Sequence, residues 1–179
     1  MDRRLDTLVR LISKETESLS LDQLRWHPEA KWSIAQVLEH LSLTYSGTKI
    51  VFDRCLNAGK TSATKPNARQ RMIALVVTGL GYMPSGREAP VPVRPKGDGS
   101  TATSASLRDK ISKMDESIAA CEARFGSNIQ IADHLILGPL TAPQWRKFHW
   151  VHGRHHLGQI RRLKKMMGLG EPRRTESLL

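Results

Sequence analysis

Histidine is the residue type best placed to do chemistry in this 179-residue chain, because four of its seven histidines fall within one short stretch. These four are His149, His152, His155 and His156. His152 and His156 are four residues apart, so on a helix they project side by side from successive turns. The two histidines of H-E-x-x-H sequences chelate a metal at the same spacing. The pair therefore predicts two ligands for a metal ion.

His40 is the candidate for a third ligand, since it lies at the border of the apolar stripe of an earlier predicted helix. Three neutral imidazoles, with the remaining positions filled by water, describe a catalytic type of site for a divalent transition metal. Zinc and nickel are the first candidates. Such a metal lowers the pKa of a bound water or thiol and makes it a nucleophile. Gln159, one turn beyond His156, could orient a ligand or substrate, whereas Glu39 points elsewhere on its helix and no general base can be named.

Other interpretations of these histidines stay open. His149 is three residues from His152 on the same predicted helix face, so that pair competes for the chelate. His155 is rotated away from this face by roughly 80° and has a cap, an ion pair or solvent as its alternatives. The paired histidines could also be hydrogen-bonded core residues without a metal. The isolated His27 and His134 are expected at surface or turn positions.

The elements that must position these side chains are helices. Four long segments carry helical periodicity and almost nothing alternates as a strand does, so we predict an all-α fold. The predicted helices cover about residues 2–19, 33–58, 106–125 and 141–167. Ser33 with Gln36, and Thr141 with Gln144, have the capping-box spacing that begins a helix. At about 100° per residue, one face of the last helix holds Trp145, Phe148, His149, His152, His156, Gln159 and Leu163.

The segment between the second and third predicted helices, residues 59–105, is different in kind. A short helix is predicted after Pro66, followed by a run rich in Pro, Gly, Ser and Thr from Met83 to Thr103. A connection this long lets the flanking helices run parallel, unlike the short loops of an up-down-up-down bundle. We therefore expect a four-helix bundle with a long crossover between helices 2 and 3.

Length and composition indicate one globular domain at residues 1–168, followed by a flexible basic C-terminal tail at 169–179. The first residues do not have the pattern of a signal peptide, and no apolar run is long enough to span a membrane. Cys55 and Cys121 form no close-spaced pair, so we expect helix-packing thiols and a cytoplasmic protein.

The formal net charge of +11 raises the question of nucleic acid as a partner. The basic residues are spread along the chain, aromatic residues are few, and no nucleic-acid-binding motif is present, so we expect neither nucleic acid nor membrane as a partner. The apolar stretch from Met72 to Leu80 exceeds what a bundle needs for its inward faces. We expect it to form a homodimer interface, with a lid over the metal pocket, walled by Met72, Val76 and Leu80, as the alternative.

Residues 31–41 (KWSIAQVLEHL) and 152–160 (HGRHHLGQI) together resemble the DinB/YfiT-like superfamily of metalloenzymes. The connector 134–145, which includes Gly138-Pro139-Leu140-Thr141, is also similar to members of that group. The resemblance covers about residues 1–168. It implies an up-down-down-up four-helix bundle whose two-fold dimers pack through helices.

The same resemblance implies a three-histidine site, with one ligand from the second helix and an H-x-x-x-H pair from the fourth. These correspond to His40, His152 and His156. The implied function is that of a metal-dependent enzyme acting on a small molecule, either as a small-thiol S-transferase or as a hydrolase. The alternative is a non-catalytic, stress-related binding or oligomerisation module in which the histidines are structural.

Overall fold

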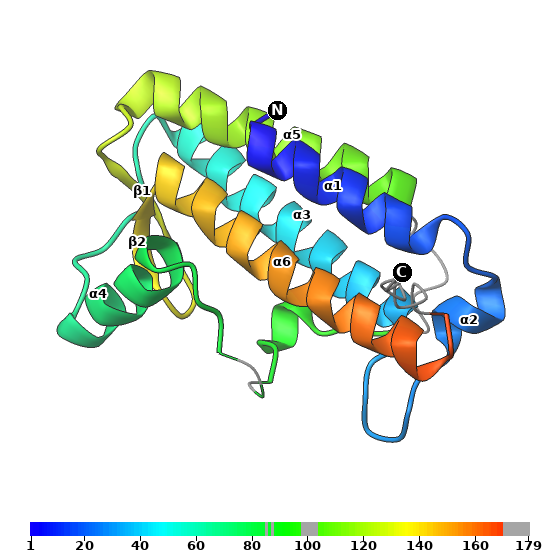
Figure 1. Cartoon of the computed structure of the whole chain (residues 1–179). Helices are drawn as coiled ribbons and strands as arrows, with labels where there is room; N and C mark the ends of the chain where they lie inside the picture. The colour runs from blue at the N-terminus through cyan, green and yellow to red at the C-terminus, as the bar shows by residue number, and fades with distance from the viewer. Residues whose placement is uncertain (85, 87, 98–103, 170–179) are drawn as a thin grey trace, which may run out of the picture.

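The computed structural model describes residues 1–84, 86, 88–97 and 104–169, and most of these are helical. Four long helices, α1, α3, α5 and α6, pack along one another as a bundle (Figure 1). In chain order the elements are α1 (Arg3–Thr16), α2 (Leu21–Arg25), α3 (Ile34–Ala58), α4 (Ala68–Ala74), a π-helical turn η1 (Leu75–Gly79), a 3-10 turn η2 (Val91–Val93), α5 (Ser104–Phe125), β1 (Gln130–His134), β2 (Gly138–Thr141) and α6 (Ala142–Met166).

The two helices that carry the candidate ligands begin where their capping boxes predicted. The Ser33 hydroxyl accepts the N–H of Gln36 at 3.1 Å, and the Gln36 side chain accepts the N–H of Ser33 at 3.0 Å. Thr141 and Gln144 make the same reciprocal pair at the start of α6. Each pair satisfies two backbone donors that a helix start leaves without partners, which fixes the first residue of the helix.

The connector between β1 and β2 corrects the expectation that the chain contains almost no strand. The two strands form a small antiparallel sheet, with an irregularity in register between Gln130 and Ala132. Its turn is held by His134, whose Nδ1 accepts the N–H groups of Ile136 and Leu137 at 3.1 Å each. The first three residues of β2 are all buried, so the strand lacks the alternation by which strands are recognised.

Two smaller differences concern the first helix. It ends at Thr16, rather than near Leu19, and the following connector contains the short helix α2. α2 begins with a third capping box, between Ser20 and Gln23. The first helix is therefore about three residues shorter than predicted.

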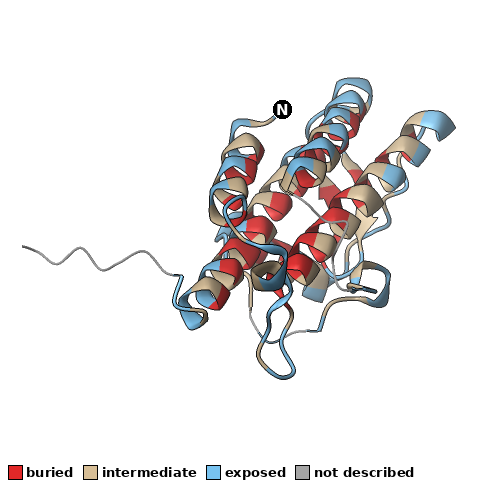
Figure 2. Cartoon of the chain, turned by 90° about the vertical axis from the view of Figure 1, so that its right-hand side faces the viewer, coloured by how far each residue is buried: buried red, intermediate tan, exposed pale blue. Residues whose placement is uncertain are grey.

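The core lies between the inward faces of the four long helices, as Figure 2 shows by the buried residues along each helix. Gly153 on α6 packs directly against α1, because a Cβ built there would lie 2.2 Å from a methyl carbon of the fully buried Leu8. Cys55 and Cys121 are free thiols inside this core, in agreement with the packing role predicted for them. Burial raises the pKa of Cys121 to about 11.

Part of the basic run near the end of α6 is used for ion pairs. Arg161 and Lys164 each donate to the carboxylate of Glu15 at 2.8 Å, which joins α6 to α1. These two cations are therefore partly neutralised. Residues 170–179 of the predicted basic tail lie outside the described residues. Within the part of the chain that is described, no helix combines the length and the apolar character needed to cross a membrane.

Candidate metal centre

The three predicted ligands meet between α3 and α6. The Nε2 of His152 lies 3.1 Å from the Nε2 of His40 and 3.0 Å from the Nε2 of His156. In the described structure these three residues form a group whose ligand atoms all lie within 4.8 Å of one another. His152 and His156 come from α6, and His40, 112 positions before His152, comes from α3. All three direct their Nε2 atom toward one point.

The spacing of these nitrogens fits a metal ion. Zinc–nitrogen bonds of about 2.0–2.1 Å place the ligand nitrogens about 3.3 Å apart at tetrahedral angles and about 3.0 Å apart at right angles. The observed separations of 3.0 and 3.1 Å match this range. Nitrogen lone pairs at such distances repel one another unless a proton or a cation lies between them. The donor set is also appropriate, because neutral imidazoles suit zinc, nickel and copper.

Two of the three rings are held by their other nitrogen. The Nδ1 of His40 lies 2.7 Å from the carbonyl oxygen of Val93, which can only accept, so this Nδ1 donates. The Nδ1 of His156 donates to the side-chain oxygen of Gln159 at 3.0 Å. A histidine protonated on Nδ1 keeps its lone pair on Nε2, and such outer contacts orient metal ligands in proteins. Gln159, the residue named for an orienting role, therefore contacts one of the three histidines.

The Val93 carbonyl belongs to a part of the crossover, residues 91–97, that we call the strap. Its backbone is hydrogen-bonded to the first turns of α3 at two further points: Gln36 Nε2 donates to the carbonyl of Gly97 at 3.3 Å, and Glu39 accepts the N–H of Lys96 at 2.9 Å. Glu39 is thus engaged with the strap through one carboxylate oxygen. Sequence reasoning missed Val93, because a backbone carbonyl carries no residue-type signal.

Aromatic rings enclose the three histidines. Phe148 stacks on His152 with ring centroids 5.3 Å apart and planes 11° apart, and Trp32 lies 5.2 Å from the ring of His40. Burial lowers the pKa of all three histidines, to about 3 for His156, and the neighbouring imidazoles lower it further. The rings are therefore neutral at neutral pH, the form that binds a metal.

The accessory candidates lie at the edge of this group. His149 is fully buried, and its ring contacts Tyr45 edge-on at 5.4 Å and stacks with Trp145 at 5.9 Å. Neither of its ring nitrogens has a hydrogen-bond partner, and burial lowers its pKa to about 3. His155 is partly buried and meets the ring of His156 edge-on at 5.2 Å.

The two isolated histidines lie outside the group. His27 is exposed and hydrogen-bonded to the carbonyl of Pro28, and His134 holds the hairpin turn. The ring of His134 also packs on Phe148, with centroids 4.3 Å apart, and burial lowers its pKa to about 4. The turn position was predicted, but the aromatic contact was not.

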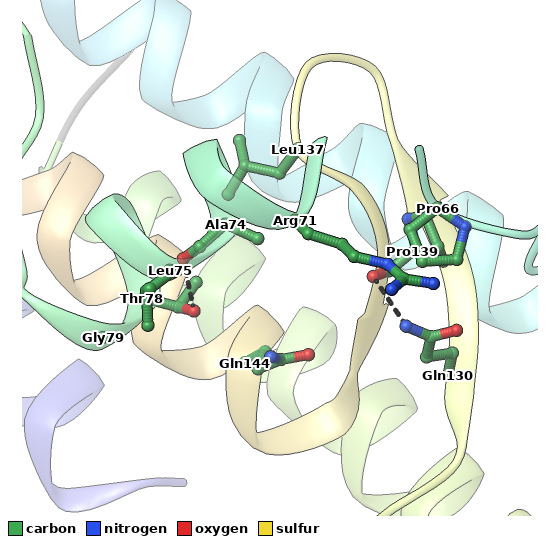
Figure 3. Close-up of a pocket in the computed structure, with 10 residues that line it drawn as sticks. All are labelled: Pro66, Arg71, Ala74, Leu75, Thr78, Gly79, Gln130, Leu137, Pro139 and Gln144. Carbon is green, nitrogen blue, oxygen red and sulfur yellow. Dashed lines mark hydrogen bonds between the residues drawn. The ribbon is translucent and has the colours of Figure 1, made fainter. Parts of the chain in front are cut away.

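A second feature is a pocket of about 450 Å³ between the crossover and the hairpin (Figure 3). It is lined by Pro66, Arg71, Ala74, Leu75, Thr78, Gly79, Gln130, Leu137, Pro139 and Gln144. Gln144 precedes His152 by eight residues, or about 12 Å along a helix, so the pocket is separate from the histidines. Met72, Val76 and Leu80 are not among these lining residues, and their predicted role as the wall of a pocket at the metal stays a prediction.

Comparison with known proteins identifies a family and a fold. The sequence model of a family described as "Protein of unknown function (DUF1569)" matches residues 4–163. No curated protein matches the sequence. Among solved structures, the chain is similar to YfiT from Bacillus subtilis, described as a probable metal-dependent hydrolase with an unusual four-helix bundle topology. The identity is 18%, over 93% of this chain and 85% of that one, with a TM-score of 0.59, which supports the four-helix-bundle fold. The chain belongs to the DUF1569 family.

Proposed function

We propose that this protein binds one divalent transition metal through His40, His152 and His156 and uses it in a reaction on a small molecule. The observation that carries the proposal is the convergence of three Nε2 atoms: that of His152 lies 3.1 Å from that of His40 and 3.0 Å from that of His156. The rings of His40 and His156 already donate through Nδ1. The fold shared with YfiT, described as a probable metal-dependent hydrolase, supports the same reaction class. Zinc and nickel are the metals we propose first.

The chain's own residues would hold and shield the ion. Val93 and Gln159 keep two of the ligands in the right tautomer, while Phe148 and Trp32 limit the access of bulk water. A divalent metal held by three imidazoles supplies Lewis acidity and activates a water molecule or a thiol as nucleophile. The buried Cys55 and Cys121 are core residues, so for S-transfer the thiol would be a small co-substrate.

We also propose the wider architecture that the family resemblance implies. The colour gradient of Figure 1 supports an up-down-down-up order, since α1 and α6 run toward one end of the bundle and α3 and α5 toward the other. The long connection between α3 and α5 is consistent with that order. A single domain at residues 1–168, a homodimeric state and a cytoplasmic location complete the proposal.

Elemental analysis of protein purified without a histidine tag tests the metal site. We expect about one equivalent of zinc or nickel per chain, removed by chelator and restored by the metal alone. A chain that holds well under a tenth of an equivalent after reconstitution would overturn the proposal.

The reaction is tested on the reconstituted protein with two substrate panels. One contains esters and amides in water, and the other contains electrophiles with a small thiol. Chelator-sensitive turnover in the first panel identifies a hydrolase, and turnover that requires the thiol identifies an S-transferase. Stoichiometric metal with no turnover in either panel would favour the non-catalytic module, with the histidines in a structural role.

A further inference from the structure

Buried polar atoms without a hydrogen-bond partner are concentrated beside the three histidines. In the described part of the chain, all such side-chain atoms belong to α3 or α6: Glu39 Oε2, Ser42 Oγ, Tyr45 Oη, both ring nitrogens of His149, and His152 Nδ1. Buried polar groups in folded proteins are almost always paired, with protein atoms or with ordered water. A cluster of such atoms on two facing helices therefore indicates a common hydrogen-bond partner.

His152 differs from the other two ligands in one respect. The Nδ1 atoms of His40 and His156 each have an acceptor, whereas the Nδ1 of His152 is sealed from solvent and has none. A histidine that binds a metal almost always donates its other N–H to a carboxylate, a carbonyl or a water molecule. An acceptor for the Nδ1–H of His152 is thus the one outer contact of the three histidines that remains to be identified.

Tyr45 and His149 supply buried polar atoms that can complete it. Both are fully buried, and their rings meet edge-on with centroids 5.4 Å apart. His149 and His152 both pack on Phe148, at 5.0 and 5.3 Å, so the two imidazoles flank the same ring. Neither Tyr45 nor His149 is within hydrogen-bond distance of His152, so a bridging molecule is needed to join them.

We propose that an internal water molecule bridges His152, His149 and Tyr45. The water accepts the Nδ1–H of His152 and the hydroxyl proton of Tyr45, and it donates to a ring nitrogen of His149. Three hydrogen bonds are the usual number for a buried water. The arrangement makes His149 and Tyr45 positioning residues, because it holds the proton of His152 on Nδ1 and leaves the lone pair on Nε2.

This inference rests on the proposed metal site, and one measurement tests it without reference to turnover. Long-range ¹H–¹⁵N spectra of the zinc-loaded wild-type protein report which nitrogen of each histidine carries a proton. We expect the Nδ1 proton of His152 to exchange slowly with solvent in the wild-type protein and much faster in His149→Phe. Zinc bound through Nδ1 of His152, or a rapidly exchanging Nδ1 proton in the zinc-loaded wild type, would overturn the inference.

The second test is the affinity for Zn²⁺ alone, measured by competition with a chelator. We expect His149→Phe to weaken binding ten- to a hundredfold, the usual effect of losing an outer contact, and Tyr45→Phe to weaken it about tenfold. His149→Gln keeps a donor and an acceptor and should recover most of the loss. Tyr82→Phe removes the same hydroxyl from a side chain that is 61% exposed and should change nothing.

Circular dichroism establishes that each variant is folded before its affinity is compared. Wild-type affinity in folded His149→Phe and Tyr45→Phe would overturn the bridge, and equal losses in His149→Phe and His149→Gln would do the same, because they would indicate packing alone. If His149→Phe does not fold, the exchange rate of the His152 Nδ1 proton in the wild-type protein tests the bridge instead. Failure of the metal site itself would appear separately, as wild-type protein that binds no zinc.

Discussion

The two ends of α6 lie in environments that differ in burial and in the kind of side chain around them. Around His152 and His156 it is covered by α3, and ring nitrogens from both helices converge on one point, with the strap holding His40 from outside. At its beginning, Gln144 lines an open pocket beneath α4 and η1. The outer side chains of that region include Leu75, which is 64% exposed, and Leu80, which is 76% exposed.

This difference suggests separate roles for the two ends of α6: metal binding at the histidine end and association with a second copy at the pocket end. Neutral imidazoles whose Nε2 atoms face one another are costly to bury, and the metal ion that we propose would offset that cost. Exposed leucines beside an open pocket require no such precision, and they are where the proposed second copy of the chain would pack. Changes at the histidine end should therefore alter metal binding, and changes at the pocket end should leave it alone.

The largest effect is expected from removing a ligand. His40→Ala, His152→Ala and His156→Ala should each weaken zinc binding at least about a hundredfold, more than the loss of an outer contact. The helical signal should be largely retained, because the apolar core residues of the bundle are unchanged in these variants. His155→Ala should matter little.

The measurement is metal content after reconstitution, with circular dichroism on the same samples. Full metal retention in all three ligand variants would reject the assignment. Loss confined to His149→Ala and His152→Ala would instead identify the i, i+3 pair as the chelate.

Gly153 should be the next most sensitive position, although it binds nothing. An added Cβ would lie 2.2 Å from the side chain of Leu8, which is fully buried and has no free space to move into. Gly153→Ala should therefore destabilise the fold by about 1–3 kcal/mol, despite the higher helix propensity of alanine. Urea unfolding measures the change. In the double variant with Leu8→Ala the two effects should be far from additive, and simple additivity would show that the contact is not the cause.

The sequence was most informative where one local interaction determines the structure. Ser33 with Gln36 and Thr141 with Gln144 located both helix starts, because a capping box involves only residues three apart. The pairing of His152 with His156 follows from helix geometry in the same way. These predictions needed no knowledge of how the helices pack.

The features that the sequence did not reveal depend on contacts between distant segments. Val93 reaches His40 across 53 positions through a backbone oxygen, and the closeness of Gly153 to Leu8 exists only once α1 has docked. The strand β2 was missed because burial by α4 and α6 removes the alternation that would have marked it. The spacing of apolar residues in a sequence indicates which face of a helix or strand is buried, but it does not indicate which other segment covers that face.

A smaller effect is expected from His134, whose pKa is lowered from 6.5 to about 4 in the folded chain. The unfolded chain takes up this proton near pH 6.5, and the folded chain only near pH 4, so stability is present above pH 6.5 and is lost as the pH falls toward 4. For this half-buried ring we expect about 1 kcal/mol between pH 7 and pH 5. His134→Asn keeps an acceptor for the turn and should flatten the dependence by that amount. His27→Asn, at an exposed histidine, should not, and an unchanged slope in His134→Asn would count against this origin.

The smallest effect on the metal site is expected from the pocket end, where only association should change. If the exposed leucines of η1 and its flank form the contact of a homodimer, light scattering coupled to gel filtration should give a dimeric mass for the wild-type protein. Leu75→Ser combined with Leu80→Ser should shift that mass toward the monomer, because it removes apolar side chains that are 64% and 76% exposed in the single chain. Zinc affinity should be the same in both proteins, since neither residue touches a histidine of the cluster. A monomeric wild type over a wide concentration range would reject the dimer, and a loss of zinc in the double variant would show that the two ends of α6 are not independent.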